Sequence, residues 1–259
     1  MKLRVAAILG ACALWAIATP RSEAASCRAH SGAATAALVE LYTSEGCSSC
    51  PPADRALSHL GEVLGPGAQG FGLALHVDYW DSLGWRDPWA QELFSERQRW
   101  LVHANHHSIV YTPHFFVSGS ELSPGLDELR AQVRAVNSRP ALAQIELSAQ
   151  LLTAGKFALD ATAQASSGVA EPALYIAVAQ SGLVSNVLRG ENAGRVLAHD
   201  HVVRTWIGPI AFVDGQVRVQ REFSVPAAPM GTGWELTAFV QEQQSGRIVQ
   251  ALGLQACMP

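Results

Sequence analysis

Residues 38–52 read LVELYTSEGCSSCPP, and they combine the patterns of a strand, a turn and the start of a helix. The apolar run 38–42 is typical of a short buried β-strand. Pro51 and Pro52 follow Cys50 directly, and proline suits the first turn of a helix because its missing N–H has no helical partner there. The stretch therefore predicts a Cys-x-x-Cys motif at the N-terminus of a helix that follows a strand.

The two cysteines of this motif are suited to thiol–disulfide chemistry. The partial positive charge and unpaired N–H groups of a helix N-terminus favour thiolate over thiol, and the thiolate is the attacking species. We assign Cys47 as the nucleophile, nearer to solvent, and Cys50 as the resolving thiol, tucked into the helix. Glu45 opposes thiolate formation, so a strongly depressed pKa is not predicted. A structural clamp and half of a metal site remain open, although zinc ordinarily needs a second cysteine or histidine pair.

Strand and helix patterns alternate around the motif. Strands are expected at 38–42, 71–77 and 115–117, and helices after Pro51-Pro52, Asp87-Pro88 and Ser123-Pro124. After residue 140 the pattern changes to period-two alternation. Strands are expected there at 144–151, 157–160, 174–179, 202–207, 217–225, 234–241 and 248–254. We predict an α/β domain over residues 25–139 and an all-β domain, a β-sandwich, over residues 140–259.

Residues 38–137 resemble a thioredoxin-fold domain. In that superfamily a cis-proline lies opposite the cysteines, and Thr112-Pro113 occupies this place about 60 residues after the motif, so the resemblance implies a cis bond there. Many of its members also bury an acid that acts on the resolving cysteine. Glu40 lies one residue further from the cysteines than that acid does in thioredoxin itself, and Gly46 replaces the usual tryptophan before the first cysteine.

The whole chain resembles, more specifically, a family of secreted bacterial proteins filed as a domain of unknown function, family twelve twenty-three. The matching stretches are ELYTSEGCSSCPPAD at 40–54, HVDYWD at 76–81, YTP at 111–113 and RGENAGR at 189–195. They come from both halves of the chain. The resemblance implies a shared architecture and no established reaction.

Residues 1–24 have the pattern of a secretory signal peptide. Their apolar run, 5–18, has 14 residues, whereas a membrane-spanning helix needs about 20. We expect cleavage after Ala24, which gives a periplasmic or secreted product. A lipoprotein box at 9–12 is the weaker interpretation because apolar residues continue beyond Cys12.

Four cysteines remain after this cleavage: Cys27, Cys47, Cys50 and Cys257. In an oxidising compartment an even number suggests pairs, so we predict a disulfide between Cys27 and Cys257. Two buried, unpaired thiols are the alternative.

The mature chain has 15 basic and 21 acidic side chains, because Lys2, Arg4, Arg21 and Glu23 leave with the signal peptide. The net charge of −6 and the lack of a basic run argue against a nucleic acid or an anionic membrane as partner. No later apolar stretch is long enough to span a membrane, so we expect a soluble protein.

Three further features stand out, and the first two have two interpretations each. The loop 79–89 is rich in aromatic and charged residues and lines a substrate groove or roofs the core. The polar, Gly-rich stretch 189–195 is favoured as a plain connection between strands, with a docking surface at the active site as the alternative. His114, next to Pro113, is the histidine expected to come nearest to Cys47.

Together these patterns predict an exported thiol–disulfide oxidoreductase. Its site residues would be Cys47, Cys50, Thr112, Pro113 and Glu40, without a cofactor. Its partners would be cysteines of other exported proteins or a redox partner. The rival hypothesis is a copper-binding or copper-delivery protein that uses the cysteine pair and a histidine, since thiolates suit Cu(I). Such proteins usually have three residues between the cysteines, not two.

Overall fold

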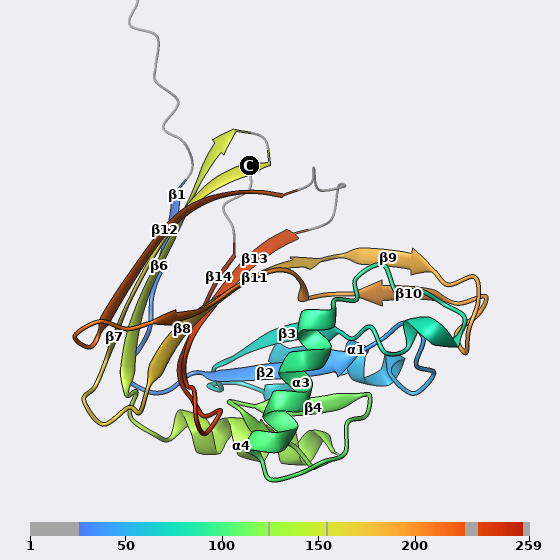
Figure 1. Cartoon of the computed structure of the whole chain (residues 1–259), viewed down its shortest axis with the longest axis horizontal. Helices are drawn as coiled ribbons and strands as arrows, with labels where there is room; N and C mark the ends of the chain where they lie inside the picture. Colours follow the sequence, from blue (N-terminus) through green and yellow to red (C-terminus); the bar gives the residue numbers. More distant parts are fainter. Residues whose placement is uncertain (1–25, 124, 154, 226–232, 256–259) are drawn as a thin grey trace, which may run out of the picture.

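The computed structural model describes residues 26–123, 125–153, 155–225 and 233–255. These residues form 14 strands, four α-helices and one short 3-10 helix, Asp81–Leu83. Eight of the strands, from both halves of the chain, build one large sheet (Figure 1). In spatial order they are β14 (Ile248–Gln255), β13 (Gly233–Glu242), β8 (Pro172–Ser181), β11 (Val202–Ala211), β3 (Gly70–His76), β2 (Ala37–Thr43), β4 (His114–Val117) and β5 (Ser120–Glu121).

The two halves of the chain meet in this sheet where β3 lies beside β11. β3 pairs in parallel with β2 on one side and with β11 on the other. At the second contact Val202 lies opposite Ala74, whose amide donates to the carbonyl of His201 at 2.8 Å. β11 then pairs antiparallel with β8, which pairs antiparallel with β13. The hydrogen-bonded ladder therefore continues from one half of the chain into the other.

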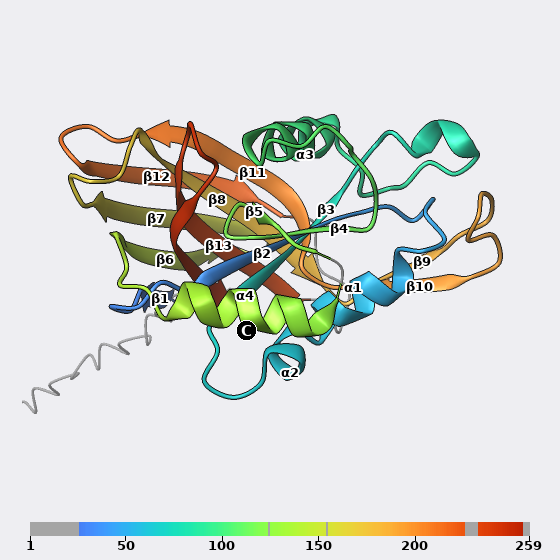
Figure 2. The ribbon, with the colours of Figure 1, turned by 90° about the horizontal axis from the view of Figure 1, so that it is seen from below.

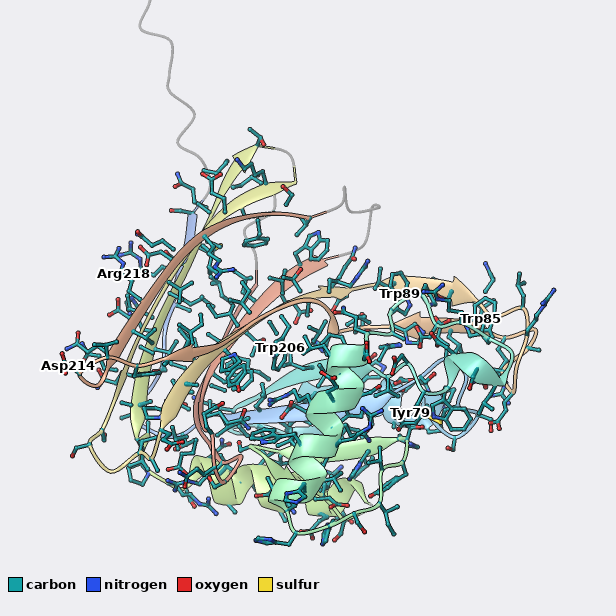
Figure 3. The ribbon with its side chains drawn as sticks, viewed as in Figure 1. Tyr79, Trp85, Trp89, Trp206, Asp214 and Arg218 are labelled. Carbon is teal, nitrogen blue, oxygen red and sulfur yellow. A yellow bond between two sulfur atoms is a disulfide. The ribbon has the colours of Figure 1, made fainter. Side chains whose placement is uncertain are left out.

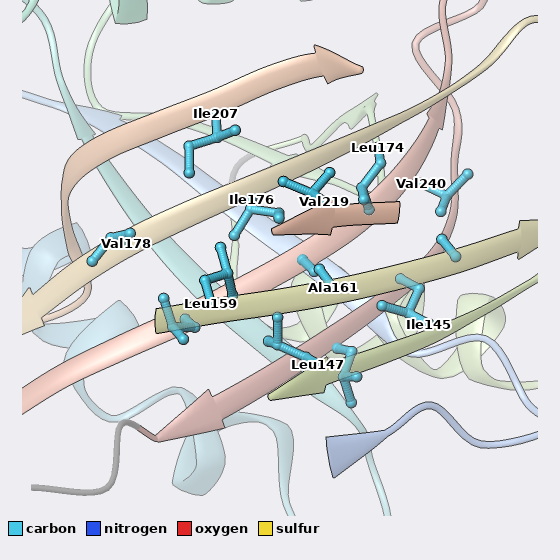
Figure 4. Packing of buried hydrophobic residues seen from close by; sticks show 14 of the residues in the cluster. Ile145, Leu147, Leu159, Ala161, Leu174, Ile176, Val178, Ile207, Val219 and Val240 are labelled. Atoms are coloured by element: carbon cyan, nitrogen blue, oxygen red, sulfur yellow. The ribbon is translucent and has the colours of Figure 1, made fainter. Parts of the chain in front are cut away.

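A second sheet packs against the β8–β13 end of the large one. Its order is β1 (Ser26–His30), β6 (Ala143–Thr153), β7 (Lys156–Ala165) and β12 (Gln216–Ser224). Apolar side chains of the two sheets face each other, for example Ile145 and Leu159 against Ile176 and Val240 (Figure 4). Their burial drives the two sheets together.

The four helices lie on opposite faces of β2 and β3. Leu38 and Tyr42 pack with α3 (Glu92–Ala104), whereas Val39 and Leu41 pack with α1 (Pro51–Ser58), α2 (Leu60–Leu64) and α4 (Leu126–Asn137) (Figure 2). Side chains alternate between the faces of a strand, so an all-apolar strand is covered on both sides. The cysteine motif at the start of α1 therefore lies on the face opposite α3.

The hairpin of β9 (Leu183–Asn186) and β10 (Val196–His199) connects β8 to β11. Its strands pair with each other and project beside α1 (Figure 1). Sequence analysis predicted neither strand.

The predicted fold class, a thioredoxin-like α/β domain followed by a β-sandwich, is wrong. The described chain is mostly β, and the strands expected to form the first domain belong to the eight-stranded sheet. The physical reason is that β3 is not an edge strand: β11 pairs with it in parallel at Ala74 and so brings the second half of the chain into the same sheet. The helix expected at Asp87-Pro88 also begins later, at Glu92.

The domain boundary expected between residues 139 and 140 stays a prediction. The signal peptide over residues 1–24 lies outside the described residues. In the described part of the chain, no helix is long and apolar enough to cross a membrane.

A buried ion pair joins α3 to β2 and also contacts strands of the second half. Arg97 donates from Nε to Oε1 of Glu40 at 2.6 Å and from Nη1 to Oε1 of Gln241 at 3.1 Å. Its guanidinium carbon lies 4.7 Å from the ring centroid of Trp206 and 5.4 Å from that of Tyr175. Burial alone would lower the pKa of Arg97, but the Glu40 carboxylate raises it above its ordinary value. Arg97 is therefore a buried cation at the junction of the two halves.

We expect Arg97→Ala to lower the free energy of unfolding by about 3–5 kcal/mol, because it leaves the Glu40 carboxylate buried without its cation. Urea denaturation followed by tryptophan fluorescence measures the loss. Lys156→Ala is the matched control, since Lys156 pairs with Glu222 at the surface and such pairs contribute about 0–1 kcal/mol. Equal, small effects of the two substitutions would contradict the role given to Arg97.

Candidate functional site

The cysteine motif lies where β2 gives way to α1. β2 ends at Thr43, and Cys50 is the N-cap residue of α1, with Pro51 as its first residue. The prediction that the helix begins at the motif is confirmed. Cys47 and Cys50 are joined by a disulfide, so the site is in its oxidised form.

Both sulfur-bearing residues are buried. Cys47 and Cys50 each have 0% of their surface exposed, whereas Ser48 and Ser49 between them are exposed. The Sγ atom of Cys47 lies 3.3 Å from the Ser49 hydroxyl. The prediction that Cys47 is nearer to solvent than Cys50 is therefore wrong. Other parts of the chain pack over the motif, and the sequence of the motif itself does not reveal them.

Glu45 is the centre of the polar contacts around the motif. Its buried carboxylate accepts hydrogen bonds from Trp85 Nε1 at 2.7 Å, Trp89 Nε1 at 3.2 Å and His199 Nε2 at 3.1 Å. Burial alone would raise the pKa of Glu45, but the bonds from His199, Ser185 and Trp85 lower it below the ordinary value. Glu45 is thus a buried anion.

These contacts show what the aromatic loop 79–89 does. The indoles of Trp85 and Trp89 fasten it to Glu45, so it packs against the motif at the end of the molecule where the β9–β10 hairpin lies (Figure 3). The same loop supplies Asp87, whose Oδ2 accepts from the backbone amide of Glu45 at 2.8 Å.

A buried histidine–aspartate pair lies next to Glu45. His76, the last residue of β3, donates from Nδ1 to Oδ2 of Asp87 at 2.7 Å, and its ring meets that of His199 edge-on with centroids 5.0 Å apart. Burial alone would lower the pKa of His76, but the charge of Asp87 and the hydrogen bond to it raise it above the ordinary value. Burial alone would raise the pKa of Asp87, and His76 lowers it instead. The two groups therefore form an ion pair.

Asp54 adds a buried acid on α1. Its Oδ1 accepts from the Thr43 hydroxyl at 2.7 Å, and its backbone amide donates to the carbonyl of Cys50 at 3.1 Å. Burial raises the pKa of Asp54 above the ordinary value, although the charges of His76 and His199 oppose this. The site thus holds groups that can keep or release a proton close to the start of α1.

An apolar pocket of about 350 Å³ adjoins the motif. Ser49, Pro52, Pro113, Phe115 and Leu126 are among the residues that line it, so the structure brings Pro113 and the motif to one pocket. The Thr112–Pro113 bond is cis, which confirms the expectation drawn from the thioredoxin resemblance.

His114 and Glu40 do not reach the cysteines. His114 is buried, with Nδ1 3.2 Å from Gln98 Nε2 and Nε2 3.0 Å from Glu121 Oε1. Glu40 binds Arg97 on the face that α3 covers, opposite α1. The copper hypothesis relied on a histidine near both sulfurs. No group of three or more His, Cys, Asp or Glu in the described part of the chain could hold a metal ion.

The loop 187–195 at the tip of the β9–β10 hairpin lies directly on the motif. Asn192 donates from Nδ2 to the carbonyls of Glu45 at 2.8 Å and Cys47 at 2.9 Å. Glu191 accepts from the amide of Ser48 at 3.0 Å. The expectation that the stretch 189–195 is a plain connection between strands is therefore wrong. The signal that could have corrected it was the stretch RGENAGR, which carries the family resemblance although it lies far from the cysteines in sequence.

The predicted bond between Cys27 and Cys257 stays a prediction, because Cys257 lies outside the described residues. The strand that holds Cys27, β1, contacts β14, whose last residue is Gln255.

The chain matches one sequence family and resembles solved structures of other proteins. The family model described as "Protein of unknown function (DUF1223)" matches residues 38–241. A protein from Agrobacterium tumefaciens has a similar crystal structure, with a TM-score of 0.61 and 25% identity over 85% of this chain and 94% of that one. HBP35 of Porphyromonas gingivalis has a TM-score of 0.63 and 14% identity, over 87% of this chain and 76% of that one, which is a likeness of fold alone. No curated protein matches the sequence.

We expect His76→Gln to destabilise the protein more at pH 6 than at pH 9. A raised pKa in the folded state means that protonated His76 stabilises the fold fully below its unfolded pKa, about 6.5, and loses this effect as the pH rises through the folded value. Urea denaturation of both proteins at the two pH values measures the difference. His30→Gln, at an exposed histidine, is the control and should show the smaller change with pH. A destabilisation by His76→Gln that is independent of pH would mean that His76 is neutral in the fold.

Proposed function

The chain belongs to the DUF1223 family, and we propose that its Cys47–Cys50 pair is a redox-active dithiol–disulfide couple that acts on cysteines of other exported proteins or of a redox partner. The observation that carries the proposal is the disulfide at the N-terminus of α1, beside a pocket that contains Pro113. We adopt the mechanism of thioredoxin-like proteins here and not their fold.

The position of the pair favours redox chemistry over a purely structural role. A helix N-terminus stabilises a thiolate. A disulfide between Cys47 and Cys50 closes a very short loop, so it restricts the unfolded chain little and adds little to the stability of the fold. The pocket beside the motif is lined by apolar side chains and borders Ser49, which is exposed. It offers a surface on which a partner segment can lie next to the cysteines.

The exchange reaction needs only the Cys47–Cys50 disulfide and the two thiols of one partner, and its atoms and electrons balance between them. A partner thiolate attacks Cys47, a bond forms between the two sulfurs, the Cys47–Cys50 bond breaks, and Cys50 leaves as a thiolate that takes up a proton. The second partner thiolate then attacks the partner sulfur of the mixed disulfide and releases Cys47. Two electrons pass to the pair, and the partner becomes a disulfide. Read backwards, the same steps reduce a partner disulfide.

The proton for Cys50 can come from Asp54. Asp54 lies one helical turn after Cys50 on α1, and residues spaced by four share a helix face. Its pKa is raised by burial, so the carboxyl group keeps a proton more readily than an exposed aspartate does. The proposed role of Asp54 thus replaces the one first expected for Glu40.

We expect Cys47→Ser to reduce the turnover of a protein disulfide, such as those of insulin with dithiothreitol as reductant, to the uncatalysed rate. Cys50→Ser should accumulate a mixed disulfide between Cys47 and the substrate, detectable by its mass, because no second thiol is present to resolve it. Wild-type turnover is the reference for both variants.

Asp214→Asn is the control for nonspecific effects, because Asp214 lies at the end of the molecule opposite Trp85 (Figure 3). Full activity of Cys47→Ser, or no catalysed turnover by the wild type in either direction, would refute the proposed function.

A further inference from the structure

Few side chains fasten the tip of the β9–β10 hairpin into the protein. Val187 is buried at the start of the loop, and from residue 188 to residue 195 Asn192 is the only buried residue, with none of its surface exposed. Segments held by few buried contacts open locally at low cost. The attachment of this tip therefore depends on what Asn192 binds.

Asn192 binds the backbone on both sides of Gly46. Its amide group donates to the carbonyls of Glu45 and Cys47, the two residues that flank the glycine. Its own oxygen, Oδ1, is buried and has no hydrogen-bond partner among the described residues. A buried acceptor without a donor disfavours the closed position, because the same oxygen would be hydrated if the loop opened. Asn192 thus holds the closed loop by two hydrogen bonds and weakens it by one missing bond.

The loop is hydrogen-bonded within itself. Its backbone bonds close on themselves, with the amide of Gly194 donating to the carbonyl of Val187 at 2.8 Å and the amide of Val187 to the carbonyl of Arg195 at 3.0 Å. Gly190, at φ 76°, lies so close to the neighbouring aromatic loop that a Cβ there would come within 3.1 Å of Trp85 Cβ. The loop therefore fits over the motif as a formed unit.

Glu191 brings negative charge to the same place. Its carboxylate accepts from the amide of Ser48 and so occupies the backbone donor that directly follows Cys47 in the chain. The Ser48 hydrogen bonds lower the pKa of Glu191, so it stays ionised. Because Glu191 and the buried Glu45 are both negatively charged, the closed loop disfavours the additional negative charge of a Cys47 thiolate.

We propose that the loop 187–195 is a gate over the cysteine pair, in which Asn192 holds the closed position and Glu191 suppresses the thiolate of Cys47. In the closed state both cysteines are buried and the disulfide is shielded. Opening frees the amide of Ser48 and one of the two acceptor positions of the Cys47 carbonyl, which also accepts from the Cys50 amide at 3.2 Å. An extended polypeptide carries the matching backbone groups, so a cysteine within such a segment is the substrate that can take the place of the loop. This inference rests on the proposed function.

The test measures how fast the Cys47–Cys50 disulfide is reduced by excess dithiothreitol, with acid quenching, alkylation and mass spectrometry to count the free thiols. We expect Asn192→Ala to accelerate reduction at least tenfold, and Glu191→Gln to accelerate it by a smaller factor. Asn186→Ala is the matched control, since Asn186 lies on the exposed face of the same hairpin, outside the loop, and it should stay within twofold of wild type.

Hydrogen exchange of the same proteins separates gate opening from unfolding. In Asn192→Ala the amides of 187–195 should exchange faster while those of β2 and β3 keep wild-type protection. Reduction of Asn192→Ala within twofold of wild type would overturn the gate, and so would a loss of protection throughout β2 and β3, which would make Asn192 a general support of the fold. Because no protein substrate is involved, a failed gate leaves the test of Cys47→Ser unaffected, and an inactive wild type leaves the gate measurable.

Discussion

The buried charge of Glu45 is the constraint on which the site depends. A carboxylate without water is tolerated only when donors surround it. Here the donors come from segments far apart in sequence, Trp85 and Trp89 from the aromatic loop and His199 from the β9–β10 hairpin. Meeting this requirement draws both segments onto the residues next to Cys47. Satisfying this anion therefore brings two of the covering segments to the motif, and Asn192 adds the tip of the hairpin.

The fold makes that assembly possible because β11 continues the sheet of β3. This pairing places the hairpin, which immediately precedes β11, at the same end of the sheet as the cysteine motif. On the opposite face the Glu40–Arg97 pair reaches Gln241 and Trp206, and so joins the same two halves of the chain. Buried charges on both faces thus hold together segments that local sequence patterns describe separately.

Sequence patterns located most of the elements but not their pairing. The apolar run at 38–42 and the prolines after Cys50 are local signals, and β2 and α1 follow them closely. The pairing of β3 with β11 and the burial of Cys47 depend on contacts between residues more than 100 positions apart, such as Asn192 with Cys47, which periodicity does not encode. Glu40 illustrates the difference. Its position on a buried strand is recognisable from the sequence, but the side of the sheet toward which it points, where it binds Arg97 of α3, is known only from the structure.

If the Cys47–Cys50 disulfide is a reversible redox couple, as we propose, and not a structural bond, it must be reducible while the protein stays folded. Its reduction potential can be measured by equilibration in glutathione and dithiothreitol buffers. Catalytic pairs have potentials between about −270 and −120 mV, whereas structural disulfides of secreted proteins lie below about −300 mV. We expect a reversible two-electron transition at a reduction potential between about −270 and −120 mV, with the protein still folded. A bond that stays oxidised below −300 mV, or that is reduced only when the protein unfolds, would contradict this expectation.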